Sequence, residues 1–571
     1  MATVLAQPGR RSATKPSADF VAVAHGRVTL ALLLFAAGIG GLGARMLYMG
    51  IASSPPSQQS LSGTPVPVRA DIVDRNGVTL ARNIDAYAIA VRPARLIRDP
   101  AELARRLNTI FPDTPAAEFE AKLRGKGWSY LRRRALPEQV AAVNAIGEPG
   151  IEFPREKERL YPQRTLAAHL LGVAGGSGHG VMGVERAFDE RLIDPARRGE
   201  PLALSIDSRV QSALEAELAS GVTEHSALGG VGIVLDVRTG EVIAMANNPT
   251  FNPNKVQGGH DPNAKCDEST SCNKAIQARY ELGSTFKPLA IAAAMDAGVV
   301  TSMSKVYDAT APIHIGGFRI KDDHPLGRWI NVPETLIHSS NIVTARIADE
   351  MGPGPLQKAY SALEFNSRPS IELGERQGTL WPRRWGRIET MTVAYGHGIA
   401  VTPLHLASAY AALVNGGVWH PATVLKQPEG FQPKGRRVFT PATSARMRQL
   451  LRMIVMSGTG RNANAEGYRV GGKTGSAEKP KDGGYARRSL VATFASAFPM
   501  EDPRYVVIVM MDEPKGNATH PGLRTAAWNA APVVKRFIER AGPMLGVFPE
   551  AVRDVDIAEL TPLLHGGQEG D

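Results

Sequence analysis

The stretch ARYELGSTFKPLAIAAAMDAG, residues 278–298, places a lysine three positions after a serine and continues as a run of helix formers. If a helix starts at Ser284, Lys287 lies one turn further along the same face, where its amine can reach the serine hydroxyl. Such a lysine acts as a base when burial or a second cation lowers its pKa. Serine is also a favoured helix cap, and the S-x-x-K pattern occurs five times in the chain, so the pattern alone does not decide between nucleophile and cap.

A second polar motif, HSSNIVTAR, lies within a helix that the sequence predicts over residues 332–352. The hydroxyl of Ser339 can relay a proton between a lysine and a leaving group. Asn341, two positions later, has an amide that can hold a substrate carbonyl. The same residues would also suit an ordinary helix bend, so this motif does not indicate catalysis without the other two motifs.

The third motif, GGKTGSAEK, contains the only Lys473-Thr474-Gly475 triplet of the chain. Glycines on both sides of it let another backbone approach closely. A strand here would offer its backbone edge to an extended substrate, and the hydroxyls of Thr474 and Ser476 can bind a carboxylate. A glycine-rich turn is the alternative interpretation.

Composition indicates a globular protein of more than one domain, with 571 residues, of which 43% are hydrophobic and 21% charged. The net charge of +11 invites a nucleic-acid interpretation, but the sequence has neither a basic stripe interleaved with aromatics nor zinc-ligand spacing. Arginines and lysines gather between Arg92 and Arg134. A solvated face is the favoured interpretation of this cluster, and a surface for an anionic membrane or polymer is the alternative.

An apolar segment near the N-terminus predicts a membrane anchor over residues 28–50, with Arg45 near one end. Four basic residues precede it against one acid, so the positive-inside rule places the N-terminus in the cytoplasm. We therefore expect a single-pass protein of the inner (cytoplasmic) membrane whose catalytic part lies in the periplasm. A cleaved signal peptide is the alternative, although its apolar region should be shorter.

The two cysteines, Cys266 and Cys272, lie close together in the polar loop AKCDESTSCNKA. In an oxidising compartment they can form a small-loop disulfide, which we favour over two free thiols. A metal site is disfavoured because the loop has too few further His or Cys residues to complete four ligands.

The remaining sequence predicts an α+β protein. Strand runs at 231–249, 490–498 and 504–512 surround a helical middle, so we expect one antiparallel sheet that unites both ends of the larger domain. Arg238-Thr239-Gly240 predicts a hairpin within the first run. We expect a cytoplasmic tail at 1–27, the anchor at 28–50, a Pro/Ser-rich linker at 51–68, a mixed α/β domain at 69–205, the larger domain at 206–545 and a poorly ordered tail at 546–571.

The order Ser-x-x-Lys, Ser-x-Asn, Lys-Thr-Gly beyond a membrane anchor is typical of penicillin-recognising serine acyltransferases. On these motifs the chain resembles the class B penicillin-binding proteins, which are peptidoglycan D,D-transpeptidases. Segments 69–81, 159–175, 180–192, 239–254 and 394–417 are similar to further boxes of that family. The chain departs from the family pattern at Ala70, Leu282, His405 and Ser476, none of which removes a catalytic group.

The resemblance implies a pedestal (dimerisation-like) domain at 69–205 and a transpeptidase domain of serine β-lactamase-like fold at 206–545. It also implies the residue roles. Lys287 would activate Ser284, and Ser339 with Lys473 would pass a proton to the leaving group. Asn341, Thr474, Gly475 and Ser476 would bind substrate, while the backbone N–H groups of Ser284 and Ser476 would stabilise the oxyanion. Neither a metal nor an organic cofactor is needed.

The implied substrates are stem peptides ending in D-Ala-D-Ala, with β-lactams as mimics that acylate Ser284. The implied partners are a polytopic glycan polymerase and other division proteins, because the chain is more similar to the septal (FtsI-like) subgroup than to the elongation subgroup. A β-lactam hydrolase or sensor is one alternative, but it would lack the boxes at 69 and 159. A non-catalytic division scaffold and an elongation-type transpeptidase are the others.

Overall fold

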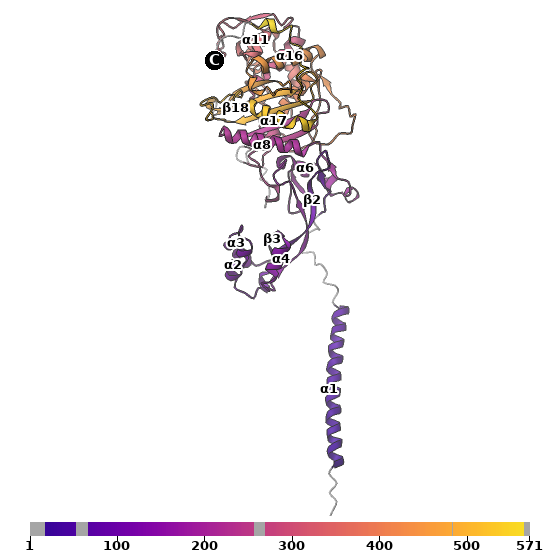
Figure 1. The fold of residues 1–571 in the computed structure, drawn as a ribbon. Helices are drawn as coiled ribbons and strands as arrows, with labels where there is room; N and C mark the ends of the chain where they lie inside the picture. Colours follow the sequence, from indigo (N-terminus) through magenta and orange to yellow (C-terminus); the bar gives the residue numbers. More distant parts are fainter. Residues whose placement is uncertain (1–16, 53–66, 256–265, 267–268, 482–483, 565–571) are drawn as a thin grey trace, which may run out of the picture. The chain divides into compact units, whose positions relative to one another are not determined.

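The computed structural model describes residues 17–52, 67–255, 266, 269–481 and 484–564. The chain forms two compact units, Met1–Val66 and Pro67–Asp571. In the first unit the helix α1 (Ser17–Ala52) contains one stretch, His25–Met46, that is long and apolar enough to cross a membrane (Figure 1). Most of the predicted linker at 51–68 lies outside the described residues.

A five-stranded antiparallel sheet forms the centre of the second unit, as the sequence predicted. Its strand order is β10-β9-β19-β18-β17, with β9 (Gly229–Asp236) and β10 (Val242–Asn248) forming the predicted hairpin. Strands β17 (Gly471–Lys481), β18 (Gly484–Phe498) and β19 (Tyr505–Asp512) come from the far end of the domain. β19 pairs with β9, so the two ends of the domain meet in the middle of the sheet, and β17 is an edge strand.

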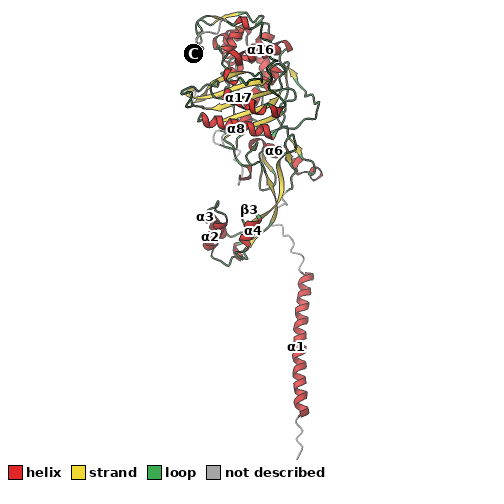
Figure 2. Cartoon of the chain, in the orientation of Figure 1, coloured by secondary structure: helices red, strands yellow, loops and turns green. Residues whose placement is uncertain are grey.

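Side chains alternate between the two faces of the sheet, so each face has its own apolar core. On one face Val507 and Val509 pack with α8 (Ser208–Glu224) and α17 (Ala530–Ala541). On the other face Val506 and Ile508 belong to the largest core, and α15 (Pro403–Val414) packs on this side. Figure 2 shows red helices on either side of the yellow strands of this sheet.

Helices and short hairpins complete the domain around this sheet. The remaining α-helices are α9 (Lys274–Gln277), α10 (Lys287–Asp296), α11 (Val332–Ile337), α12 (Asn341–Met351), α13 (Pro353–Ala362), α14 (Arg387–Val393) and α16 (Pro441–Ser457). The short strands pair as β11 (Val306–Asp308) with β14 (Trp329–Asn331), β12 (Ile313–Ile315) with β13 (Phe318–Ile320), and β15 (Val418–Trp419) with β16 (Arg436–Arg437).

The pedestal is built on a second sheet of short strands around one long strand, β2 (Thr79–Val91). Its other strands are β1 (Ile72–Val73), β3 (Ser129–Ala135), β4 (Ile151–Glu152), β5 (Arg155–Leu160) and β8 (Leu202–Ala203). The helices are α2 (Pro100–Ile110), α3 (Ala116–Leu123), α4 (Pro137–Asn144), α5 (Ala168–Leu171), α6 (Gly183–Ala187) and α7 (Asp189–Ile193), and β6 (Val173–Ala174) pairs with β7 (Gly180–Met182). Asp99 caps α2, and its side chain accepts from the N–H groups of Ala101 and Glu102.

Three charged residues from separate sequence boxes form a buried network in the pedestal. Glu185 is fully buried and accepts from Arg69 Nε and Arg159 Nε, each at 2.7 Å. A buried carboxylate needs such partners because it has lost its hydration. The boxes at 69–81, 159–175 and 180–192 are therefore held to one another by this network.

Side chains on both sides join the pedestal to the larger domain. The Asn254 amide donates to the Tyr161 carbonyl at 2.8 Å and accepts from the Tyr161 N–H at 3.0 Å. Asp74 accepts from the N–H of Ser208 at 3.0 Å and from its hydroxyl at 2.7 Å. These contacts connect the boxes at 69–81 and 239–254 to the opposite domain.

Carboxylates lie beside many side chains of the basic cluster between Arg92 and Arg134. The ion pairs are Arg92–Glu152, Arg106–Glu102, Lys122–Glu118, Arg124–Glu120, Arg132–Asp113 and Arg134–Glu158. Local neutralisation of this kind supports the solvated-face interpretation over an anion-binding surface.

The expectation of a poorly ordered tail from residue 546 is wrong for residues 546–564. Leu560 is fully buried in the main core, and Asp554 accepts from Arg452 Nε at 2.9 Å and Nη2 at 2.8 Å. The Asn331 amide donates to the Leu563 carbonyl at 2.6 Å. Charged residues interrupt the apolar ones in this segment, so its sequence gives no clear helix or strand period.

Candidate active site

Ser284 lies in a 3₁₀ turn, Gly283–Phe286, directly before α10. The cap positions of the turn and of α10 are Leu282 and Phe286, and neither helix has a side-chain cap. Ser284 therefore does not act as the helix cap that its sequence context allowed. Its side chain is half-buried, and Lys287 is the first residue of α10.

Two lysine side chains converge on the hydroxyl of Ser339. Lys287 Nζ donates to Ser339 Oγ at 3.1 Å and also to the Ser339 carbonyl. Lys473 Nζ donates to the same Oγ at 2.9 Å and to the Thr474 carbonyl at 3.0 Å. Both lysines are fully buried. Because the two ammonium groups use both lone pairs of the hydroxyl, its own proton is left to be donated elsewhere.

The predicted contact between Lys287 and the Ser284 hydroxyl is not made. Within the described ranges the Ser284 side chain forms no hydrogen bond, and the Lys287 amine is directed to Ser339 instead. Ser339 offers the buried ammonium both a carbonyl and a hydroxyl oxygen, which replace more of its lost hydration than a single hydroxyl can.

Burial sets the protonation of the two lysines. It lowers the pKa of Lys287 to about 7, against the opposing charges of Asp322 and Asp323. Burial and the charge of Lys287 lower the pKa of Lys473 well below its ordinary value. The pKa of His397 is lowered by burial and then by Lys287. The site thus favours an uncharged amine near neutral pH, as a general base requires.

The predicted helix over 332–352 is broken in two at the Ser-x-Asn motif. α11 ends at Ile337, α12 starts at Asn341, and Ser339 between them has a φ of 59°. Left-handed backbone at a residue other than glycine costs on the order of 1–3 kcal/mol, so the surroundings must hold it. This turn brings the Ser339 side chain between the two lysines, which an uninterrupted helix would not do.

The Lys-Thr-Gly triplet lies on the edge strand β17, against the Ser284 turn. A Cβ atom on Gly475 would lie 2.3 Å from the Leu282 carbonyl oxygen, so glycine is required there. The Thr474 hydroxyl donates to Thr459 Oγ1 at 2.9 Å, and Ser476 Oγ accepts from the Ala526 N–H at 3.2 Å. The strand predicted at this motif is confirmed in place of a glycine-rich turn.

Two departures from the family pattern have structural explanations. His405 forms the capping box of α15 with Thr402, whose Oγ1 lies 2.9 Å from His405 Nδ1, so histidine satisfies the cap. Leu282 is buried. Its side chain belongs to the main core.

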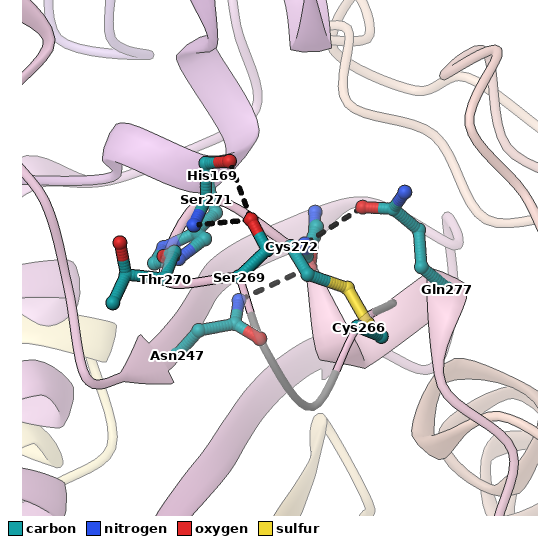
Figure 3. Close-up of a disulfide and its surroundings, with 9 residues drawn as sticks. His169, Asn247, Cys266, Ser269, Thr270, Ser271, Cys272 and Gln277 are labelled. Atoms are coloured by element: carbon teal, nitrogen blue, oxygen red, sulfur yellow. Dashed lines mark hydrogen bonds between the residues drawn. A yellow bond between two sulfur atoms is a disulfide. The ribbon is translucent and has the colours of Figure 1, made fainter. Parts of the chain in front are cut away.

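The Cys266–Cys272 disulfide closes the polar loop that precedes α9 (Figure 3). The Cα atoms of the two residues are 5.2 Å apart. Thr270 lies between the two cysteines in the sequence, and its carbonyl oxygen is 2.8 Å from Nε2 of His169, a pedestal residue. Among the described residues, no group of three His, Cys, Asp or Glu side chains could hold a metal ion.

Comparisons with known proteins agree with this geometry. Residues 230–539 match the penicillin binding protein transpeptidase domain, and residues 64–193 match the penicillin-binding protein dimerisation domain. The chain is 38% identical over 493 residues to the probable peptidoglycan D,D-transpeptidase FtsI of Caulobacter vibrioides, covering 84% of this chain and 82% of the relative. It is 31% identical over 495 residues to peptidoglycan D,D-transpeptidase FtsI of Escherichia coli K12, covering 80% and 81%.

A solved structure gives the same fold. The crystal structure of penicillin binding protein 3 from Mycobacterium tuberculosis in complex with aztreonam has a TM-score of 0.65. It covers 86% of this chain and 100% of the crystallised chain at 24% sequence identity.

Two glycines beside the Ser284 turn give a matched test of how tightly this site is packed. A Cβ on Gly396 (φ 85°) would lie 2.2 Å from the Gly283 carbonyl oxygen, whereas a Cβ on Gly398 (φ 76°) would meet nothing nearer than Thr392 Oγ1 at 3.8 Å. Gly398→Ala should cost only the left-handed strain, roughly 1–2 kcal/mol. Gly396→Ala should lower the melting temperature further and slow penicillin labelling, and equal effects of the two substitutions would contradict the close approach.

Proposed function

This chain belongs to the penicillin-binding protein transpeptidase family, and we propose that it is the septal peptidoglycan D,D-transpeptidase of its cell, acting through an acyl-enzyme on Ser284. The convergence of two buried lysines on Ser339, beside the Ser284 turn, carries the proposal for the site. The FtsI-like relatives, named as peptidoglycan D,D-transpeptidases, support the substrate and the reaction.

In the first step the uncharged Lys287 amine removes the Ser284 proton. The lowered pKa of Lys287 makes this form available near neutral pH. Ser284 Oγ then attacks the carbonyl carbon of the penultimate D-alanine of a stem peptide. The oxyanion that forms is stabilised by the backbone N–H groups of Ser284 and Ser476.

The tetrahedral intermediate then loses the terminal D-alanine. Ser339, held also by Lys473, donates its proton to the leaving amine as the C–N bond breaks, and Lys287 passes to Ser339 the proton that it took from Ser284. The donor peptide remains as an ester on Ser284. An amine of a neighbouring stem peptide attacks the ester, the ester C–O bond breaks, and Ser284 regains a proton as the cross-link forms.

The edge strand β17 is the proposed binding surface for the stem peptide. Among the described residues no further strand follows β17 in the sheet, so its outer edge can pair with an extended peptide, and Gly475 lets the Ser284 turn lie close to the strand. The Thr474 and Ser476 hydroxyls bind the terminal carboxylate, and the Asn341 amide positions the substrate carbonyl. A β-lactam would occupy the same place as a mimic of D-Ala-D-Ala and acylate Ser284.

Two alternatives have less support. A β-lactam hydrolase or sensor would not need the dimerisation domain matched at residues 64–193. A non-catalytic scaffold would not need two buried lysines, because burying an ammonium costs several kcal/mol.

We propose that α1 anchors the chain in the inner (cytoplasmic) membrane with the N-terminus in the cytoplasm. Arg10, Arg11, Lys15 and Arg27 precede or border the apolar stretch, and disulfides persist in oxidising compartments such as the periplasm. Protease added outside spheroplasts should therefore digest the part beyond the anchor. If this part were protected in intact spheroplasts and digested only after lysis, the orientation would be the opposite one.

The septal role and the partners rest on the FtsI relatives. We propose that the chain works with a polytopic glycan polymerase and other division proteins, and that it has no nucleic-acid partner. Depletion of the protein should give long cells without completed septa, because only division would lose its cross-linking enzyme. Rounded cells with normal septa would point instead to the elongation-type transpeptidase.

The nucleophile assignment predicts the result of a paired substitution. Ser284→Ala should abolish covalent labelling of the full chain by a fluorescent penicillin in detergent. Ser302→Ala is the matched control, because Ser302 also lies three residues before a lysine but its hydroxyl is exposed and contacts Ser304 Oγ at 2.7 Å. Persistent labelling of Ser284→Ala, read on a denaturing gel, would refute the assignment.

A further inference from the structure

A short loop after strand β13 contacts the Ser-x-Asn turn from outside the known motifs. The loop consists of residues 321–323 and follows Ile320, whose side chain is buried in a small apolar cluster with Ala345, Met391 and Tyr395. Ala345 lies on α12, so the cluster fixes the loop against the helix that begins with Asn341.

Asp322 in this loop is buried and accepts three hydrogen bonds from consecutive residues at the start of α12. Its Oδ1 accepts from the N–H of Asn341 at 2.6 Å and of Ile342 at 2.9 Å. Its Oδ2 accepts from the Ser340 hydroxyl at 2.8 Å. The carbonyl of the preceding Lys321 accepts from the Asn341 side-chain amide at 2.9 Å.

These contacts lie directly after the strained residue of the site in the sequence. Ser339, with its left-handed backbone, directly precedes Ser340. The two lysines hold the Ser339 side chain, but the following backbone needs its own support because α12 begins only at Asn341. Asp322 supplies that support from 18 to 20 residues earlier in the sequence and also satisfies N–H groups that a helix start leaves without partners.

Asp323, the next residue, provides a natural comparison. It is exposed and forms no hydrogen bond or ion pair with the residues that the structure describes. The negative charge of Asp323 nevertheless acts to raise the pKa values of Lys287 and Lys473. The negative charge of Asp322 also acts to raise the pKa of Lys287. The two carboxylates thus share an electrostatic effect on Lys287, but only Asp322 has a geometric one.

We propose that Asp322 is the positioning residue of the Ser-x-Asn turn, holding Ser339 between the two lysines and Asn341 toward the substrate. The proposal rests on the proposed acylation of Ser284, because misplacement of Ser339 would lower the rate of that step. Displacing the carboxylate by one carbon should then slow acylation more than removing its charge does.

The test compares three single substitutions in the full chain in detergent. Asp322→Asn keeps an oxygen for the two N–H groups and loses the charge. Asp322→Glu keeps the charge and displaces the carboxylate by one methylene. Asp323→Asn loses a charge without losing a described hydrogen bond. For each variant, the acylation rate constant at saturating fluorescent penicillin is measured across pH 5–9, well below its melting temperature.

Geometry and charge predict different patterns. Asp322→Glu should acylate at least about tenfold more slowly on the high-pH plateau, whereas Asp322→Asn and Asp323→Asn should stay within about threefold of the unaltered chain. Removing either negative charge lowers the pKa of Lys287, so both Asn variants should keep the free amine to lower pH and shift the acid limb downward. Lys473 and His397 also face Lys287 and are unchanged in every variant.

Three outcomes would decide the matter. A plateau rate for Asp322→Glu equal to that of the unaltered chain would overturn the proposal. An equal loss in all three variants would overturn it too, because Asp323→Asn removes no described hydrogen bond to the turn. If Asp322→Glu does not fold, Asp322→Ser, which is too short to bridge the same three donors, takes its place with the same expected loss. Failure of the unaltered chain to acylate would instead overturn the proposed function.

Discussion

Two ammonium groups that share one serine hydroxyl impose the main constraint on this structure. Lys287 and Lys473 are fully buried and both donate to Ser339 Oγ. Burial of one charged amine is costly and burial of two neighbours is more so, which lowers the proton affinity of both. Backbone carbonyls of Ser339 and Thr474 offset part of this cost. Because this cost favours the uncharged form of the amine, it makes a lysine available as a base near neutral pH.

Three segments distant in sequence must meet within a few ångströms to maintain this arrangement. The Ser284 turn, the Ser339 turn and strand β17 are brought together by the sheet that joins both ends of the domain. Glycines remove the side chains that would keep them apart, with Gly475 against the Leu282 carbonyl and Gly396 against the Gly283 carbonyl. The pedestal contacts the same domain through Asn254, so its boxes stabilise the scaffold without entering the site.

Much of the fold was predictable from local pattern, and most of what was missed depends on tertiary contacts. The β9–β10 hairpin and the sheet uniting both ends follow from strand runs and turn residues. The break at Ser339 was missed because helix formers flank it and its φ is held by contacts from elsewhere. Asp322 was missed because no local signal marks a side chain that caps a later helix. The direction of Lys287 toward Ser339 likewise depends on the fold.

The central claim is that Ser284 forms an acyl-enzyme that hydrolyses slowly, because a transpeptidase must keep the ester until an amine arrives. Intact-protein mass spectrometry of the full chain in detergent with excess benzylpenicillin, followed over hours and completed by peptide mapping, tests it most directly. We predict one stable adduct, with the mass of the whole drug, located on Ser284. An adduct that disappears while the drug is consumed, or the absence of any adduct on folded protein, would contradict the account.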